Sequence, residues 1–325
     1  MGVIGAVDIG GTKIAIGVVD KVGRVLSKLE GPTDASRGYA DALARIVAML
    51  RQTAQNARMP ISGIGIGTTG MVHALTGVIC DADFLPGWAG ANPVTDLSRA
   101  FNVSAALEND GDAAALGEAA WGAGKGKSRI IYITIGTGIG GGIIVDGHLY
   151  RGADMSHPEV GHHVIDLDGP PCSCGFRGCW EVLATGPAMA AWFNSQSSQA
   201  NRELTAEEVC QLAREGDTLA HRAVEREAYF LGLGLANLIN LFVPDVIVLG
   251  GSVMKSADLF LDGIRKTITQ GCRFVPAEKT EIALASLGAD ANLIGAARVW
   301  HHRFGQQAGR AFKSAVGPRK WERGE

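Results

Sequence analysis

The sequence predicts an α/β protein of two lobes, each built on a similar sheet-and-helix unit, with a cleft between the copies. Two β-rich hairpins, at residues 3–20 and 129–147, open the two halves of the chain, and each has glycines at its turn. Further strand-like and helical runs follow each hairpin, but not in the strict alternation of a Rossmann fold. The chain of 325 residues is long enough for two hydrophobic cores.

The first half contains the elements of one unit. Residues 3–10 and 13–20 are β-rich and are separated only by Gly11 and Thr12, which predicts a hairpin. The remaining expected elements are, in order, a strand at 24–31, a helix at 39–57, strands at 61–67 and 103–110, and an alanine-rich helix at 112–121. We therefore expect an N-terminal α/β lobe over residues 1–120.

The second half repeats this pattern. Strands at 129–136 and 141–147 form its hairpin. The later expected elements are buried strands at 245–251 and 281–288 and helices at 225–242, 255–270 and 290–304. We expect a C-terminal lobe over residues 121–289, with the helix at 290–304 completing the first lobe. The basic and polar residues 306–325 are predicted to be a solvated tail.

Residues 159–181 have the composition of a metal-bound loop. His162, Cys172, Cys174 and Cys179 are spaced H-x9-C-x-C-x4-C, and three thiolates with one imidazole make a complete tetrahedral zinc set. A disulfide with a spare thiol fits less well, because three clustered cysteines cannot pair off. Four protein ligands leave no open position for a substrate water. The loop is therefore predicted to hold a structural Zn²⁺ whose flanking carboxylates, Glu159 and Glu181, serve the function.

Composition excludes several classes of protein. The net charge of −3 argues against a nucleic-acid backbone as the main partner. The N-terminus lacks the basic start of a signal peptide, and no apolar run approaches the length of a membrane span. Cys80, Cys210 and Cys272 are isolated and are expected to be buried thiols. We therefore expect a cytoplasmic protein without a nucleic-acid or membrane partner.

The glycine-rich hairpin turns are candidates for phosphate binding. Residues 136–141 contain G-x-G-x-x-G, but a strand follows instead of the helix that a dinucleotide site requires. Successive backbone N–H groups at a glycine-rich turn can instead form an anion-binding nest. Two such turns, at 8–13 and 136–141, could clamp a polyphosphate, and Asp8 suits Mg²⁺ bound through water. The alternative is that these glycines serve only tight hairpin packing.

Seven segments together resemble the ROK family (repressor, open reading frame, kinase). They follow that family's order and spacing from Val3 to about Gly295: DIGGTK (8–13), GIGTTG (65–70), ENDGDAAALGEA (108–119), IGTGIGGGIIVDG (135–147), EVGHH (159–163), CSCGFRGCWE (172–181) and PDVIVLGGSV (244–253). The resemblance implies a two-lobed, actin-like ATPase fold of ribonuclease-H type with a zinc-bound loop. It also implies a sugar substrate, ATP with Mg²⁺, and a homodimer.

The resemblance implies roles for individual residues. Asp110 matches the catalytic base, and it also belongs to the sugar-binding set. The other positions that match the sugar site are Gly70, Asn109, Glu159, His162 and Glu181. The phosphate loops are matched by Asp8, Gly10, Gly11, Thr12, Thr137 and Gly138, and the glycines beside the adenine by Gly250 and Gly251. Four positions depart from the family pattern around the sugar: Thr69, Asp83, Gly111 and Asp112.

The reaction chemistry supports the same interpretation. Phosphoryl transfer to an alcohol needs an aligned hydroxyl, a carboxylate to accept its proton, and cations on the phosphates. Asp110 suits the base, although it could also simply cap the following helix. Glu159 and Glu181 could be the acid pair of a glycosidase, which the phosphate loops disfavour. A ROK repressor is expected to carry a helix-turn-helix before residue 8, and this chain begins its first strand at Val3.

The sequence therefore predicts an ATP-dependent hexose kinase that phosphorylates the 6-hydroxyl of glucose. Polar sugar contacts without an evident apolar pocket favour a free aldohexose. Thr69 and Asp83 could still house an N-acetyl group, so N-acetylmannosamine and N-acetylglucosamine remain alternatives, followed by fructose. A non-catalytic sugar-sensing regulator is the distant alternative.

Overall fold

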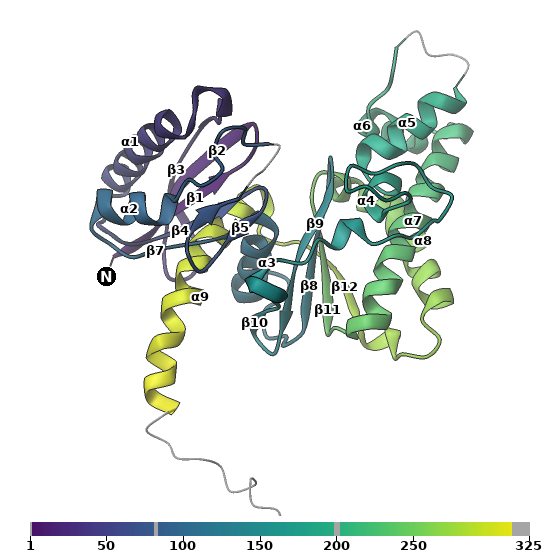
Figure 1. Cartoon of the computed structure of the whole chain (residues 1–325). Coiled ribbons are helices and arrows are strands. Elements are labelled where there is room, and N and C mark those ends of the chain that lie inside the picture. The colour runs from purple at the N-terminus through teal and green to yellow at the C-terminus, as the bar shows by residue number, and fades with distance from the viewer. Residues whose placement is uncertain (1, 81–83, 198–201, 314–325) are drawn as a thin grey trace, which may run out of the picture. The chain divides into compact units, whose positions relative to one another are not determined.

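The computed structural model describes residues 2–80, 84–197 and 202–313. The chain divides into two compact units, residues 1–117 with 289–325 and residues 118–288. Each unit has its own five-stranded sheet, coloured purple to blue in the first unit and teal to green in the second (Figure 1).

The first unit is a mixed sheet with helices on its faces. Its strands are β1 (Val3–Ile9), β2 (Lys13–Val19), β3 (Val25–Pro32), β4 (Ile61–Thr68) and β7 (Ala105–Asn109), with a ribbon of β5 (Val72–His73) and β6 (Val78–Ile79). Its helices are η1 (Ala35–Arg37), α1 (Tyr39–Ala57), α2 (Pro93–Phe101), α9 (Ala291–Lys313) and the start of α3 (Asp110–Trp121). The strand order is β3-β2-β1-β4-β7. β1, β2 and β3 pair antiparallel, whereas β1, β4 and β7 pair parallel.

Alternation along the strands gives this sheet two buried faces. Val7 belongs to the cluster that includes Ile46 of α1, whereas Ala6 packs with Leu293 of α9. Successive strand residues point to opposite faces, so α1 and α9 cover opposite sides of the sheet. At Gly65 a Cβ atom would lie 1.8 Å from the Ala296 carbonyl oxygen, and only glycine permits this close approach of α9.

The second unit repeats the topology of the first. Its strands are β8 (Ile130–Ile135), β9 (Ile139–Val145), β10 (His148–Leu149), β11 (Val246–Gly250) and β12 (Glu281–Leu284), in the order β10-β9-β8-β11-β12. Its helices are α4 (Trp180–Leu183), α5 (Gly186–Gln196), α6 (Ala206–Arg214), α7 (Thr218–Phe242) and α8 (Ala257–Gly271), with short 3-10 turns η2 (Ala153–Met155), η3 (Val160–His162), η4 (Val253–Ser256), η5 (Ala277–Lys279) and η6 (Gly288–Asp290). Along the order of each sheet, two antiparallel strand pairings are followed by two parallel pairings. This shared order confirms the predicted duplicated α/β unit.

The expected elements differ from the structure in several places, one of which is α7, which begins at Thr218 and not at the expected residue 225. The last helix, expected at 290–304, continues to Lys313, because no proline interrupts residues 305–313 and alanine, glutamine and arginine favour a helix. The predicted tail therefore begins later than residue 306, and its part at 314–325 lies outside the described residues. β12, expected to be buried, is a four-residue edge strand with Leu284 42% exposed. Helix α2, whose Asn92 caps the Thr95 N–H, was not predicted.

No helix among the described residues is both long enough and apolar enough to cross a membrane.

Candidate functional site

The carboxyl ends of β1, β4 and β7 carry the candidate residues of the first unit. These parallel strands end side by side, with Asp8 opposite Gly67 and Asn109 opposite Thr68. Side chains that follow adjacent parallel strands gather at one edge of the sheet. The turn Gly10–Thr12, called here the first glycine turn, joins β1 to β2 at this edge and is closed by a 2.9 Å bond from the Gly10 N–H to the Lys13 carbonyl.

Asp8 and Asp110 form an acidic pair at this edge. Burial, followed by repulsion from Asp110, raises the pKa of Asp8 to about 7, although Lys13 and a hydrogen bond with Asn292 oppose the rise. A carboxyl group held this way binds a proton or a cation readily. Asn292, at the start of α9, was not predicted as a site residue. It lies far from β1 in the sequence, and nothing in the local pattern marks it.

Asn109 and Asp110 are fixed by the start of α3. The Gly111 N–H donates to Asn109 Oδ1 and to Asp110 Oδ1, each at 2.8 Å. Asn109 Nδ2 donates to the Gly70 carbonyl oxygen at 3.2 Å, and Gly70 adopts φ 81°, which favours glycine. Asn109, which is 7% exposed, thus ties the 65–70 loop to the start of α3. Asp110 is the first residue of α3, which is the position of a helix cap. It also lies close enough to Asp8 to raise the pKa of that carboxyl, which is the position that a catalytic base would need.

Lys13 lies at the strand edge. Its ammonium forms an ion pair with Glu30 at 3.1 Å, and its side chain is 56% exposed. Thr69 is one of the residues that depart from the family pattern. Its backbone N–H donates to the Ile9 carbonyl at 2.9 Å. Asp83 lies outside the described residues.

The candidate phosphate loop of the second unit is the turn between β8 and β9. This second glycine turn, Gly136–Gly138, is closed by a 3.0 Å bond from the Gly136 N–H to the Gly138 carbonyl, with Thr137 exposed at its tip. The Gly136 carbonyl also accepts from the Gly186 N–H of α5 at 3.1 Å. Rigid backbone at a glycine turn leaves its N–H groups preorganised for an anion.

Glu181 contacts the second glycine turn directly. Its Oε2 accepts from the Ile139 N–H at 2.9 Å, and a Cβ at Gly138 would lie 2.5 Å from the same oxygen. Within the described residues we find no hydrogen bond to Glu181 Oε1, so this oxygen can accept from a ligand. Glu159, by contrast, is exposed, and its Oε1 lies 3.9 Å from His157 Nε2.

Gly250 and Gly251 end β11 at a corner that only glycines fit. A Cβ at Gly251, where φ is 91°, would lie 2.2 Å from the Ile135 carbonyl oxygen. The next residue, Ser252, lies beside the second glycine turn. A Cβ atom added at Gly136 would be 3.3 Å from the Ser252 Oγ. The structure thus brings together residues 136–138 and 250–252, which are far apart in the sequence. Ser252 was not predicted.

The four predicted metal ligands lie together. The ligand atoms of His162, Cys172, Cys174 and Cys179 are all within 4.8 Å of one another. His162 Nδ1 is 3.4 Å from Cys172 Sγ, and the sulfurs of Cys174 and Cys179 are 3.5 Å apart. Two thiolates on one tetrahedral Zn²⁺ lie roughly 3.8 Å apart, given Zn–S bonds of about 2.3 Å. The cluster therefore fits zinc, and its sulfur separation is far longer than a disulfide bond.

The backbone around the cluster is shaped for this approach. Gly175 and Gly178 adopt φ of 97° and 65°, and a Cβ at Gly178 would lie 1.5 Å from the Asp166 carbonyl oxygen. The Cys172 N–H donates to the Phe176 carbonyl at 2.8 Å. A hydrogen bond from the backbone of Phe176 lowers the pKa of the exposed Cys174 thiol, whereas burial raises the pKa of the neighbouring Cys179 thiol to about 12. The same loop leads into α4 and so positions Glu181.

Comparison with known proteins assigns the chain to a family. The family model described as "ROK family" matches residues 4–303. A glucokinase of Streptomyces coelicolor is 34% identical over 315 residues, covering 91% of this chain and 97% of the relative. A xylose repressor of Bacillus spizizenii is 34% identical over 245 residues, which are 73% of this chain and 62% of the repressor.

A solved structure extends this comparison to the fold. The ROK family glucokinase of Streptomyces griseus, in complex with glucose and AMPPNP, has a TM-score of 0.77 and 32% identity, covering 92% of this chain and 99% of that one. The match confirms the predicted actin-like ATPase fold. The chain belongs to the ROK family.

Proposed function

We propose that this protein is an ATP-dependent sugar kinase that transfers the γ-phosphoryl group of ATP to the 6-hydroxyl of a hexose, with glucose as the preferred substrate. The observation that carries the proposal is the pair Asp8 and Asp110 beside the first glycine turn, with Asp8 near the end of β1 and Asp110 at the start of α3. Phosphoryl transfer needs one carboxylate for the proton and one for the cation, next to donors for phosphate. The full-length similarity to glucokinases supports the same reaction class.

In the proposed reaction Asp110 is the general base. The 6-hydroxyl oxygen of the sugar bonds to the γ-phosphorus as its proton passes to the Asp110 carboxylate. The bond from the γ-phosphorus to the oxygen bridging the β- and γ-phosphates breaks, and ADP leaves. Asp8 would hold Mg²⁺ through water, and the ion would neutralise phosphate charge. A base of this kind contributes on the order of 10²–10⁴-fold to the rate.

The other predicted residues receive supporting roles. The first and second glycine turns would bind phosphate oxygens, and Gly250 and Gly251 would lie beside the adenine. Asn109, Glu159, His162 and Glu181 would hold sugar hydroxyls, with Gly70 closing the sugar loop. The Cys/His cluster would hold a structural Zn²⁺ that orders the loop. A homodimer and a cytoplasmic location stay predictions, to be tested by light scattering and cell fractionation.

A second function has one specific observation in its favour. The similarity to a xylose repressor is consistent with a ROK protein that senses a sugar without turning it over. Such a protein has no need of a base, whereas Asp110 is present here.

A coupled ADP-release assay decides between these functions. Glucose, N-acetylmannosamine, N-acetylglucosamine, fructose and xylose are each offered with Mg²⁺·ATP, and kcat/KM is compared. We expect glucose to give the highest value. A preference of tenfold or more for an N-acetyl sugar would replace glucose but keep the kinase. Sugar binding by calorimetry without any ADP release would favour the regulator.

A further inference from the structure

The segment after β3 is hydrogen-bonded to the first glycine turn through Thr33. Thr33 is 0% exposed, and its hydroxyl donates to the Gly10 carbonyl oxygen at 2.6 Å. Its backbone N–H donates to the Thr12 carbonyl oxygen at 2.9 Å. One residue therefore binds the carbonyl groups at both ends of the turn.

These two bonds fix the direction of the N–H groups of the turn. In a planar trans peptide the C=O and the following N–H point in opposite directions. The Gly10 carbonyl points to Thr33, so the Gly11 N–H points away from it. The Thr12 carbonyl also points to Thr33, which fixes the peptide between Thr12 and Lys13. Thr33 thus fixes two peptide groups of the turn and leaves the Gly11 N–H directed away from itself, as a donor to an anion requires.

Arg45 of α1 holds Thr33 in turn. Its guanidinium donates to the Thr33 carbonyl at 2.6 Å and also to the Pro32 carbonyl. Its Nε donates to Asp41 at 2.8 Å, and Arg37 donates to the other oxygen of Asp41 at 2.7 Å. A guanidinium with a fixed fork of donors can bridge two carbonyls and a carboxylate at once, which an ammonium cannot do in this geometry.

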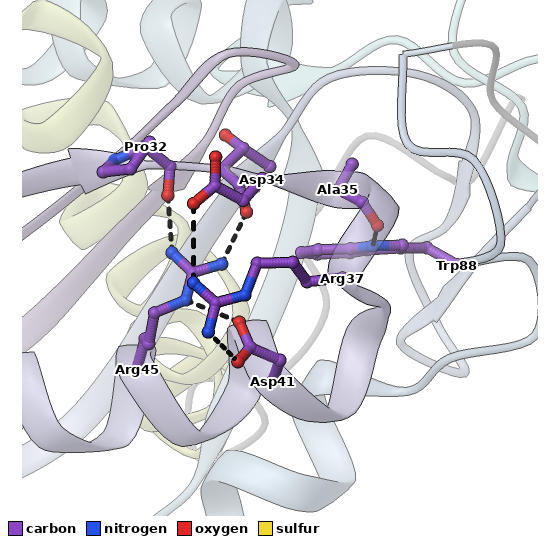
Figure 2. Close-up of polar contacts among 8 residues, drawn as sticks. Pro32, Asp34, Ala35, Arg37, Asp41, Arg45 and Trp88 are labelled. Carbon is purple, nitrogen blue, oxygen red and sulfur yellow. Dashed lines mark hydrogen bonds and ion pairs between the residues drawn. The ribbon is translucent and has the colours of Figure 1, made fainter.

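The segment is anchored from a second direction. Figure 2 shows the Trp88 indole beside Ala35, whose carbonyl accepts from the indole N–H at 3.3 Å. Trp88 is 0% exposed, so this anchor is rigid. The residues from Pro32 to Ala35 are thus fixed by α1 on one side and by the loop before α2 on the other.

We propose that Thr33 and Arg45 are positioning residues for nucleotide binding, which they support by fixing the peptide groups of the first glycine turn with the Gly11 N–H directed away from Thr33. This inference rests on the proposed function, in which that turn binds phosphate. Neither side chain touches the nucleotide. Thr33 acts on the turn directly, and Arg45 acts through Thr33.

The test compares substitutions of buried threonines. Thr33→Val keeps the shape and removes the hydroxyl, whereas Thr33→Ser keeps the hydroxyl. Thr53→Val is the matched control, because Thr53 is also 0% exposed and its hydroxyl donates to the Met49 and Leu50 carbonyls within its own helix α1. For each protein we would measure KM for ATP, KM for glucose, the affinity for Mg²⁺·AMPPNP by calorimetry, and the melting temperature.

Thr33→Val is expected to raise KM for ATP about tenfold. The variant loses one hydrogen bond and leaves the Gly10 carbonyl unpaired, and a loss of this kind corresponds to about a tenfold change in affinity. KM for glucose should not change, and Thr33→Ser should restore most of the nucleotide affinity. Thr53→Val should leave both KM values unchanged. The proposal is overturned if Thr33→Val and Thr53→Val have the same nucleotide affinity, or if Thr33→Val raises both KM values alike.

Arg45 gives a second variant at a partly exposed position, in case Thr33→Val does not fold. Arg45→Lys should weaken nucleotide binding in the same direction, and Arg51→Lys on the same helix should not. Equal nucleotide affinity in these two variants would contradict the role of Arg45.

Calorimetry also separates this inference from the proposed function. If the wild-type protein binds Mg²⁺·AMPPNP but phosphorylates no sugar, the kinase proposal fails while the affinities of the Thr33 variants still decide the inference. If the wild-type protein binds no nucleotide, both fail.

Discussion

Replacing Asp8 by asparagine is expected to make the protein more stable and less active. Burial and the nearby charge of Asp110 raise the pKa of Asp8 from an ordinary 3.8 to about 7. Ionisation of this carboxyl therefore lowers the stability of the folded protein. The difference between these pKa values corresponds to about 4 kcal/mol at most. Asp8 keeps some exposure to water, which weakens the effect, so we expect a gain of about 2 kcal/mol in Asp8→Asn.

The gain should depend on pH in a defined direction. The unfolded chain releases the Asp8 proton near pH 3.8, and the folded protein keeps it up to about pH 7. The folded state binds more protons in this window, so the contribution of Asp8 to stability falls as pH rises through it and is constant above. Asp8→Asn lacks this titration. Its advantage over the wild type should therefore grow from pH 5 to pH 8.

The assay is thermal unfolding at pH 5, 7 and 8 in Mg²⁺-free buffer. Asp20→Asn is a control for which the change in stability should have the opposite sign. Partial burial would raise the pKa of Asp20, but hydrogen bonds from Arg24 and Val22 lower it, so loss of this carboxylate should destabilise the protein. Asp8→Asn should also lose most of its activity, because an amide binds Mg²⁺ more weakly than a carboxylate. An Asp8→Asn variant no more stable than the wild type at pH 8 would refute this reasoning.

Two further predictions concern the second unit. Cys174→Ala should lower bound zinc, measured by metal analysis, and glucose affinity together, because the same loop carries Glu159 and Glu181; full activity in a zinc-free protein would contradict it. Glu118 is 0% exposed and accepts from the backbone N–H groups of Ala123, Ser286 and Leu287. Glu118→Gln should cost about 1–3 kcal/mol, seen as a lower melting temperature, and an unchanged melting temperature would argue against it.

The parts of the fold that could be predicted from sequence are those with a local periodic signal. Helix α1 begins at Tyr39 and ends at Ala57, as predicted, because Ala42, Ile46 and Leu50 recur at helical spacing on its buried face. The two hairpins follow from β-rich runs around glycines. Helix α2 was missed because its nine residues contain only two buried side chains.

The site was predictable in its residue types but not in its contacts. The four metal ligands lie within a short stretch of sequence, so their spacing alone predicts the cluster. The bond from Ile139 to Glu181 joins residues 42 apart, and the bond from Thr33 to Gly10 joins residues 23 apart. Asn292 reaches Asp8 from the far end of the chain. Contacts of this kind arise from the packing of the sheet and leave no periodic pattern in the sequence.

The role of Asp110 as the general base is the central claim, and its direct test is the rate of the chemical step. Asp110→Asn keeps size and hydrogen bonding but cannot accept the proton of the 6-hydroxyl. With glucose and Mg²⁺·ATP, the wild-type protein should form glucose 6-phosphate, identified by ³¹P NMR. Asp110→Asn should lower kcat by about 10²-fold or more, with glucose affinity by calorimetry largely unchanged. Turnover of Asp110→Asn near the wild-type rate would leave Asp110 as a helix cap only and would contradict the mechanism.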